Sequence, residues 1–219
     1  MPDSQDMGLV TANQQVSDQA SFPTGAILAG GQSARMGQPK AAVRLWDGRT
    51  MIEHVLDTLL AICPRVVVAG VDSSLRIQAG ARVVHIPDRK GGLGPLSGID
   101  ALLASGLDSR YVVAACDQPL LSVMLLRRLA EGDPQRPHFF RAARVSSILP
   151  LPAYLPASLL GGVQRILLSP DRSLRALMAA APPQWIEISR EEEELLTSVN
   201  TPSELAELNQ RRRGHGRAY

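Results

Sequence analysis

Residues 28–40, LAGGQSARMGQPK, combine bare backbone with two cations directly after an apolar run. Glycines at 30, 31 and 37 let backbone N–H groups approach an anion without interference from a Cβ atom. Arg35 and Lys40 add positive charge, so we expect this segment to hold a polyphosphate. A glycine-rich turn with two solvated cations is the alternative. The segment matches neither the Walker pattern nor the Gly-x-Gly-x-x-Gly dinucleotide fingerprint.

The use of lysine favours the first interpretation. Of 23 basic residues, 21 are arginines, and the two lysines, Lys40 and Lys90, both lie in glycine-rich segments after apolar runs. A lysine ammonium is compact and can follow a phosphate through a reaction, whereas the guanidinium is planar and bulkier. We therefore assign Lys40 to phosphate chemistry and leave Lys90 unassigned.

Two aspartates follow apolar runs in the same way. Asp117 comes directly after YVVAAC, and Asp88 comes shortly after ARVVHI. A carboxylate at the end of a strand can bind Mg²⁺ that bridges phosphate oxygens. A helix cap or a turn residue is the alternative role for either one. Glycines at 91, 92, 94 and 98 form a second backbone-rich loop, which we expect to recognise a base.

These residues need strands that end at one edge of a sheet. Short apolar runs typical of buried strands recur at residues 25–30, 65–70, 81–86 and 111–116. Helical patterns occur at residues 51–62, 96–106, 162–168, 172–181 and 202–212. Strands that alternate with helices predict an α/β fold with a mostly parallel sheet covered on both faces. Ligands collect beyond the carboxyl ends of such strands.

The chain is expected to form one domain with two tails. Residues 1–23 lack apolar periodicity and predict a flexible N-terminal extension, residues 24–210 the folded domain, and residues 211–219 a basic C-terminal tail. Pro150, Pro152 and Pro156 argue against a central strand within residues 138–160 and favour either an excursion at the edge of the sheet or a subregion on the substrate side.

Composition excludes several classes of protein. A net charge of +2 is too small to indicate nucleic acid or an anionic membrane as the main partner. Cys63 and Cys116 are too few for a disulfide framework. No apolar stretch is long enough to span a bilayer, and the N-terminus lacks the pattern of a signal peptide. We expect a cytoplasmic protein, and a monomer.

Five motifs in order resemble one family. LAGGQSARMGQPKA, PDRKGGLGPLSGI, CDQPLL, RSLRAL and SVNTPSEL are similar to motifs of the molybdenum cofactor guanylyltransferase (MobA) family of nucleotidyltransferases, over residues 24–209. The resemblance implies a single Rossmann-like three-layer domain of the GT-A-like type. It implies transfer of GMP from MgGTP to molybdopterin or Mo-molybdopterin, which gives molybdopterin guanine dinucleotide and pyrophosphate. Other molybdenum cofactor biosynthesis proteins or apo-molybdoenzymes would be further partners.

The resemblance also implies roles for individual residues. Arg35, Lys40 and Asp117 would be catalytic, with Arg35 and Lys40 on the triphosphate and Asp117 as the Mg²⁺ ligand. Asn200 matches an asparagine near the reaction centre, on the acceptor side. The implied nucleotide contacts are Leu28, Ala29, Gly30, Gly31, Lys40, Asp88, Gly94, Pro95, Leu96, Gly98 and Asp117.

Some positions depart from the family pattern. Pro39 replaces an aspartate, Ser198 the first asparagine of the late motif, and Ala69 an asparagine that contacts the nucleotide in some members; Leu149-Pro150 stands where a His-Pro or Gln-Pro pair is common. These changes leave the acceptor open. A cytidylyltransferase or another nucleotidyltransferase of the same fold, a Rossmann oxidoreductase and a non-catalytic nucleotide-binding module are the alternatives, although LAGG and GPLSG favour guanine over cytosine.

Overall fold

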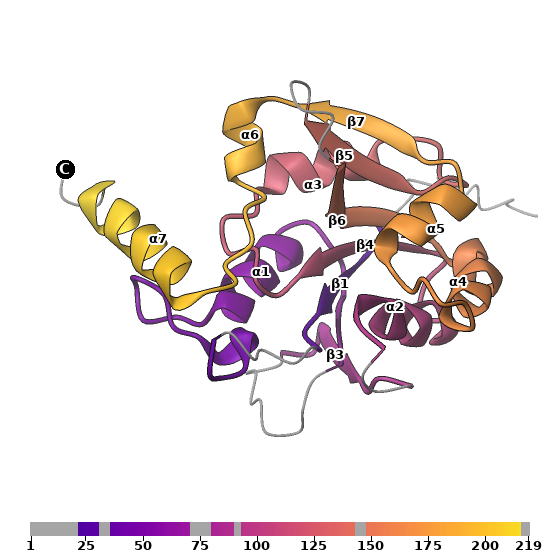
Figure 1. Ribbon diagram of the computed structural model, residues 1–219, viewed down its shortest axis with the longest axis horizontal. Helices are drawn as coiled ribbons and strands as arrows, with labels where there is room; N and C mark the ends of the chain where they lie inside the picture. The colour runs from indigo at the N-terminus through magenta and orange to yellow at the C-terminus, as the bar shows by residue number, and fades with distance from the viewer. Residues whose placement is uncertain (1–21, 31–35, 71–79, 90–92, 143–147, 216–219) are drawn as a thin grey trace, which may run out of the picture.

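The computed structural model describes residues 22–30, 36–70, 80–89, 93–142 and 148–215. Within these residues the strands form one seven-stranded sheet in the order β3-β2-β1-β4-β6-β5-β7 (Figure 1). Their bounds are β1 Thr24–Leu28, β2 Val66–Ala69, β3 Val83–Ile86, β4 Arg110–Ala115, β5 His138–Ala142, β6 Ile148–Pro156 and β7 Gln184–Ile188. Strand β6 runs antiparallel to both of its neighbours, and every other adjacent pair is parallel.

The central strands are buried on both faces, which explains why they are apolar throughout. All residues of β1 and β2 are buried, and β1 pairs in register with β2 and with β4. Leu28 lies opposite Ala69 on one side and Ala115 on the other. The carboxyl ends of β1, β2, β3 and β4 therefore meet at one edge of the sheet.

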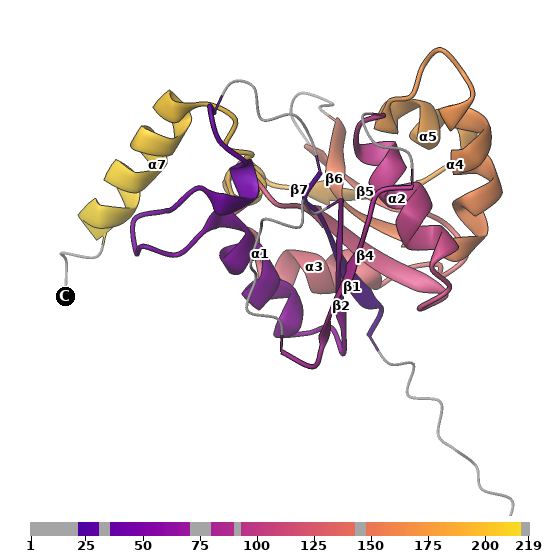
Figure 2. The same cartoon turned by 90° about the horizontal axis from the view of Figure 1, so that it is seen from below.

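Helices cover both faces of the sheet and make the fold three-layered (Figures 1 and 2). Helices α1 (Met51–Leu60) and α3 (Val123–Ala130) pack on one face, and α2 (Pro95–Ala104), α4 (Leu160–Leu167) and α5 (Leu174–Ala180) pack on the other. The remaining elements are η1 (Lys40–Ala42), η2 (Ala157–Leu159), α6 (Arg190–Glu194) and α7 (Pro202–His215). In the described part of the chain, no helix is both long and apolar enough to cross a membrane.

Helix α7 lies apart from the sheet and from the helices that cover its two faces, beside the segment that follows the first glycine loop (Figure 2). Leu205 and Leu208 of α7 pack against a small apolar cluster that contains Val43, Leu45 and Val199. This packing holds the start of α7 near η1, which begins at Lys40. The helix continues to His215, whereas we expected a basic tail from residue 211 onward.

The expectation that prolines exclude a central strand from residues 138–160 was wrong. Strand β6 lies between β4 and β5, so it is an interior strand. Phe139 of β5 pairs with Ala153, but Phe140 pairs with Leu149, so residues 150–152 form an irregularity in the ladder. Pro150 and Pro152 lie in this bulge, where no ladder hydrogen bond is needed from their nitrogens. Pro156 lies at the strand end, opposite Arg110.

The predicted mostly parallel sheet with helices on both faces is confirmed. The N-terminal extension predicted for residues 1–23 lies almost wholly outside the described residues. The four apolar runs are β1 to β4, and the helices at 51–62, 96–106, 162–168, 172–181 and 202–212 are present with boundaries shifted by at most three residues. Strand β7, helix α3 and the short helix α6 were not predicted, because their segments are short and mixed in polarity.

Candidate active site at the carboxyl edge of the sheet

The structure gathers several of the expected residues where β1, β2, β3 and β4 end. Gly30 lies two residues after β1, Gly70 one residue after β2, Asp88 two residues after β3 and Asp117 two residues after β4. Lys40, the first residue of η1, reaches the same edge from a loop. Gly31 and Arg35 lie outside the described residues.

Asp117 is the centre of a polar cluster built from three distant parts of the sequence. Its Oδ2 atom accepts a hydrogen bond from Lys40 Nζ at 2.8 Å, and the same ammonium donates to Asn200 Oδ1 at 2.5 Å. The Lys40 and Asp117 side chains are 22% and 13% exposed, so solvent screens their attraction only in part. Asp117 Oδ1 is buried and has no hydrogen-bond partner among the residues that the structure describes. A buried carboxylate oxygen without a partner is costly unless a ligand completes it.

The start of α7 fixes Asn200 in this cluster. Val199 donates its backbone N–H to Asp117 O at 2.8 Å, which ties the two segments together. Glu204 Oε2 accepts hydrogen bonds from the backbone N–H groups of Asn200 and Thr201, at 2.6 and 3.0 Å. Glu204 N in turn donates to Thr201 Oγ1 at 3.2 Å, which completes a capping box. The Asn200 N–H bond is the main cause that lowers the pKa of Glu204.

A second carboxylate lies against bare backbone. A Cβ atom on Gly30 would lie 3.1 Å from Asp88 Oδ2, and one on Gly70 would lie 3.0 Å from both Cα and N of Gly30. Gly70 also has a φ of 77°, which side chains rarely adopt. Asp88 Oδ1 is buried and has no hydrogen-bond partner in the described part of the chain, and burial raises the pKa of this carboxyl. Asp88 is therefore poised to accept a hydrogen bond from a ligand.

The second glycine loop leads into α2 beside this carboxylate. Gly94 and Pro95 are exposed at the start of the helix, and Gly94 has a φ of 72°. A Cβ atom on Gly98 would lie 3.1 Å from Leu28 Cδ2 and 3.6 Å from Asp88 Oδ1, so the helix packs closely against β1 and the carboxylate at this position. Leu96 is completely buried in the core, as Leu28 nearly is, and Ala29 is partly buried.

A cavity of about 350 Å³ adjoins Asp117 on the side away from Asp88's strand. One wall comes from the end of β4 and the bulge of β6, and the other from residues 193–198. Leu149, Pro150 and Ser198, three of the departures noted in the sequence, all line it. The lining residues are Ala115, Asp117, Gln118, Leu149, Pro150, Leu151, Glu193, Leu196, Thr197 and Ser198.

Gln118 is a residue of this site that sequence reasoning did not single out. It is 2% exposed, and its Nε2 atom donates to Leu151 O at 2.9 Å and to Leu196 O at 3.0 Å. Its Oε1 atom accepts from Ala115 N at 3.2 Å. Gln118 therefore joins the two walls of the cavity. Its place next to Asp117 in the CDQPLL motif was the available signal.

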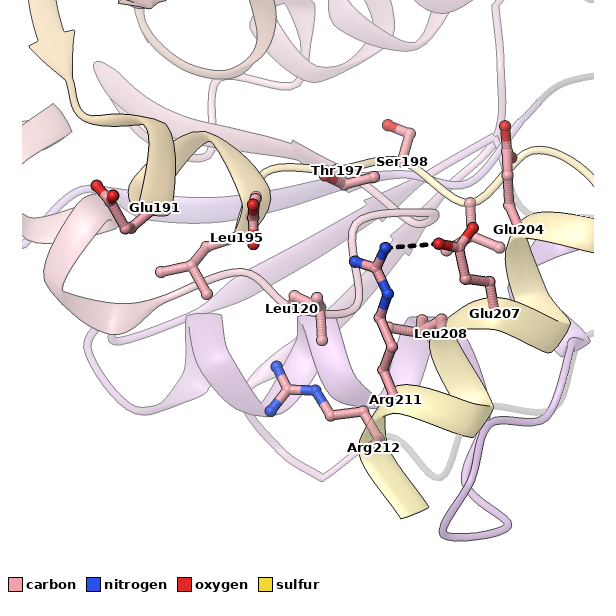
Figure 3. Close-up of a pocket in the computed structure, with 12 residues that line it drawn as sticks. Leu120, Glu191, Leu195, Thr197, Ser198, Glu204, Glu207, Leu208, Arg211 and Arg212 are labelled. Atoms are coloured by element: carbon pink, nitrogen blue, oxygen red, sulfur yellow. Dashed lines mark hydrogen bonds and ion pairs between the residues drawn. The ribbon is translucent and has the colours of Figure 1, made fainter. Parts of the chain in front are cut away.

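A larger cavity of about 450 Å³ lies on the other side of residues 197 and 198 (Figure 3). Its walls are α6 and α7, with glutamates and arginines around a floor that includes Leu120 and Leu195. Glu207 and Arg211 pair across one turn of α7. Asp117 and Lys40 do not line this cavity, so it is separate from the cluster described above.

Comparison with known proteins places this arrangement in a family. Residues 25–186 match the model of the MobA-like NTP transferase domain. The chain belongs to this family. The MobA-like chain is 34% identical over 189 residues to the molybdenum cofactor guanylyltransferase of Xanthomonas euvesicatoria pv. vesicatoria, a match that covers 84% of this chain and 93% of that protein. The family resemblance inferred from the five motifs is thus confirmed.

Solved structures show the same fold. Molybdopterin-guanine dinucleotide biosynthesis protein A from Archaeoglobus fulgidus superposes with a TM-score of 0.69 at 24% identity. The match covers 87% of this MobA-like chain and 99% of the Archaeoglobus chain. The 2-C-methyl-D-erythritol 4-phosphate cytidylyltransferase from Thermus thermophilus superposes with a TM-score of 0.64 at 18% identity, with 87% and 99% covered. These likenesses confirm a nucleotidyltransferase fold.

Proposed function

We propose that this MobA-like protein transfers GMP from GTP to molybdopterin and releases pyrophosphate. The observation that carries the proposal is the position of the Lys40 ammonium, which donates to both Asp117 and Asn200. The other carboxylate oxygen of Asp117 is buried and has no hydrogen-bond partner among the described residues. A family model over residues 25–186 supports nucleotidyl transfer. The guanylyl and molybdopterin parts are supported by the relative named a molybdenum cofactor guanylyltransferase.

The residues present fit a divalent cation at Asp117. Mg²⁺ is held in nucleotide sites by one or two carboxylates together with phosphate oxygens, so a single partly buried carboxylate is sufficient protein ligation. Within the described ranges, Asp117 Oδ1 has no hydrogen-bond partner to give up, while Lys40 Nζ donates to Oδ2. When bound there, Mg²⁺ would supply neutralisation of phosphate charge.

Lys40 is proposed to act on the phosphates, and Asn200 to position Lys40. In the proposed reaction a phosphate oxygen of the acceptor forms a bond to the α-phosphorus of GTP, and the bond to the leaving pyrophosphate breaks. Lys40 neutralises negative charge that develops on the transferred and leaving groups, and Asn200 holds the ammonium in place through its Oδ1 atom. Arg35, known here only from the sequence, is proposed to bind the same triphosphate.

A covalent intermediate on the protein is not part of this proposal. Burial raises the pKa of the Cys116 thiol, the nearest sulfur in sequence to Asp117, to about 12. The thiol therefore stays protonated at neutral pH and is a poor nucleophile. Positioning and charge neutralisation supply the catalysis.

Nucleotide and acceptor would lie on opposite sides of Asp117. The bare backbone of Gly30 and Gly70 with Asp88 is proposed to receive the nucleoside, together with Gly94, Pro95 and Gly98 at the start of α2. The cavity beside Asp117 is proposed to receive the acceptor, because it is lined by Asp117 and lies next to Asn200 through Ser198.

Pyrophosphate release tests the proposal. The protein is incubated with Mg²⁺ and GTP, with and without molybdopterin, and pyrophosphate is measured over time. We expect release only when both substrates are present. Binding of GTP without any release of pyrophosphate would contradict an enzyme and support a nucleotide-binding module instead.

A further inference from the structure

The cavity beside Asp117 contains a carboxylate that the proposed chemistry does not use. Among its described lining residues, the charged side chains are Asp117 and Glu193. Asp117 is paired with Lys40. Glu193, near the end of α6, is partly buried, and its carboxylate forms no hydrogen bond or ion pair in the described part of the chain.

The other polar groups of the cavity limit what a ligand can meet there. The side-chain amide of Gln118 is fully engaged by Leu151, Leu196 and Ala115. The hydroxyls of Thr197 and Ser198 can donate or accept, but an ionised carboxylate such as Glu193 only accepts. The group opposite Glu193 must therefore carry N–H or O–H donors, and a phosphate there would be repelled.

The remaining lining is apolar and suits a flat ring. Leu149, Pro150, Leu151 and Leu196 contribute hydrocarbon to a cavity of about 350 Å³, within the range of pockets that enclose small organic ligands. A largely apolar wall beside the carboxylate of Glu193 fits a heterocycle that presents its donors along one edge.

We propose that Glu193 recognises the edge of the acceptor's pterin ring that carries the 2-amino group and N3–H. This inference rests on the proposed function, which supplies molybdopterin as the acceptor. Two parallel N–H donors on that edge match the two oxygens of a carboxylate. The phosphate end of the acceptor would then lie toward Lys40 and Asp117.

Two simple ring compounds test the inference directly. Pterin carries the 2-amino group, whereas lumazine has an oxygen at the same position. Calorimetry on the full chain should show pterin binding at least tenfold more tightly than lumazine. The reason is that lumazine places its 2-oxygen, a hydrogen-bond acceptor, opposite the Glu193 carboxylate, which also only accepts. Glu193→Gln should reduce this ratio to about threefold or less. Equal affinity of the parent protein for the two compounds would overturn the proposal.

A neighbouring glutamate provides the control. Glu194 follows Glu193 on α6 but lines the other cavity, so Glu194→Gln should leave the ratio unchanged. In the transfer assay, Glu193→Gln should raise KM for molybdopterin about tenfold and change kcat and KM for GTP less than twofold. A loss confined to kcat, or an equal effect of Glu194→Gln, would count against Glu193. If the parent protein discriminates between the two rings but forms no nucleotide product, the proposed function fails while this inference stands.

Discussion

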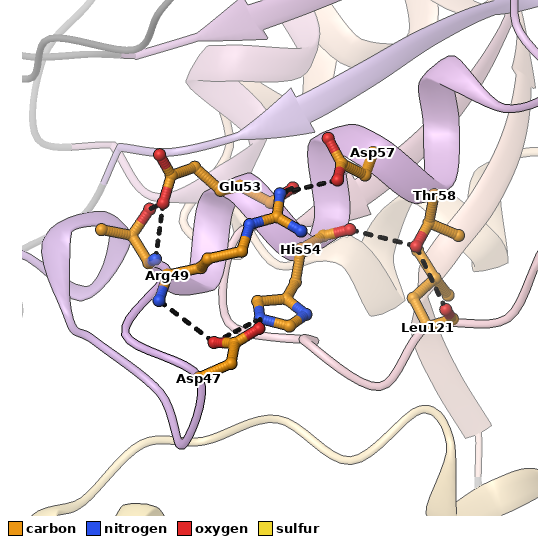
Figure 4. A network of polar contacts seen from close by, with 8 residues as sticks. Asp47, Arg49, Glu53, His54, Asp57, Thr58 and Leu121 are labelled. Carbon is orange, nitrogen blue, oxygen red and sulfur yellow. Dashed lines mark hydrogen bonds and ion pairs between the residues drawn. The ribbon is translucent and has the colours of Figure 1, made fainter.

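The capping box at the start of α7 should matter for catalysis as well as for stability. Glu204 holds the backbone of Asn200 and Thr201, and Asn200 in turn holds the ammonium of Lys40. Helix α1 has a matched box, in which Glu53 Oε2 accepts from Thr50 N at 2.7 Å and from Thr50 Oγ1 at 2.8 Å (Figure 4). Each box consists of a threonine and a glutamate three residues later. Of the two, only the α7 box is linked to Lys40 by the hydrogen bonds described.

Glu204→Ala and Glu53→Ala should therefore have similar effects on folding. Loss of a cap costs about 1 kcal/mol, within a range of about 0.5–2 kcal/mol. For a domain of this size, about 1 kcal/mol lowers the melting temperature by about 2–4 °C. Thermal unfolding followed by circular dichroism should give melting temperatures of the two variants that agree within that range.

Their effects on turnover should differ. Without Glu204, the backbone of Asn200 loses its shortest described hydrogen bond, and Lys40 loses a fixed partner. A misplacement of about 1 Å in a positioned group can cost up to about 100-fold in rate, so we expect Glu204→Ala to lower kcat between about 10- and 100-fold. Glu53→Ala should change kcat by less than about twofold. Equal kcat values for the two variants at equal stability would refute the link from Glu204 to Lys40.

Three further predictions concern the strand edge. Lys40→Ala should lower kcat by about 100- to 1,000-fold in the pyrophosphate assay, the cost of one lost transition-state contact, while the protein stays folded; near-normal turnover would remove Lys40 from the site. Burial raises the pKa of Asp88, so its ionisation weakens the fold as pH rises from 3.8 through the raised value. Asp88→Asn should therefore raise the melting temperature at pH 7 and weaken GTP binding, and a lower melting temperature would contradict this. Gly70→Ala should destabilise more than Gly106→Ala and also weaken GTP binding: φ is positive at both positions, but only at Gly70 would the new Cβ meet Gly30 backbone. Equal unfolding free energies in urea would refute this.

The parts of the fold that could be predicted are those with simple periodicity. Four buried parallel strands appear as continuous apolar runs because both of their faces are covered. The residues just after such strands meet at one edge, so Asp88 and Asp117 could be placed there from their position alone. Lys40 could be assigned to phosphate chemistry because lysine is rare in this chain and because Lys40 lies in a glycine-rich segment after an apolar run. Asn200 could be placed only through the family resemblance, because nothing local links residue 200 to residue 40.

The parts that could not be predicted depend on long-range packing. Strand β6 tolerates Pro150 and Pro152 because the ladder shifts register at that point, and a register shift has no local sequence signal. The cavity beside Asp117 is closed by residues 193–198, a segment without periodicity whose position depends on contacts with Gln118 and Asp117. The need for glycine at position 70 comes from its contact with Gly30, which lies 40 residues earlier in the sequence, after the neighbouring strand β1.

Competition between two nucleotides tests guanylyl transfer most directly. The parent protein is given molybdopterin, Mg²⁺ and an equimolar mixture of GTP and CTP, and the dinucleotide products are separated and identified by mass. A site whose buried polar groups match one base leaves them unpaired with the other, so the guanine product should exceed the cytosine product at least tenfold, or about 1.4 kcal/mol. Equal amounts of the two products, or an excess of the cytosine product, would contradict the guanylyl assignment.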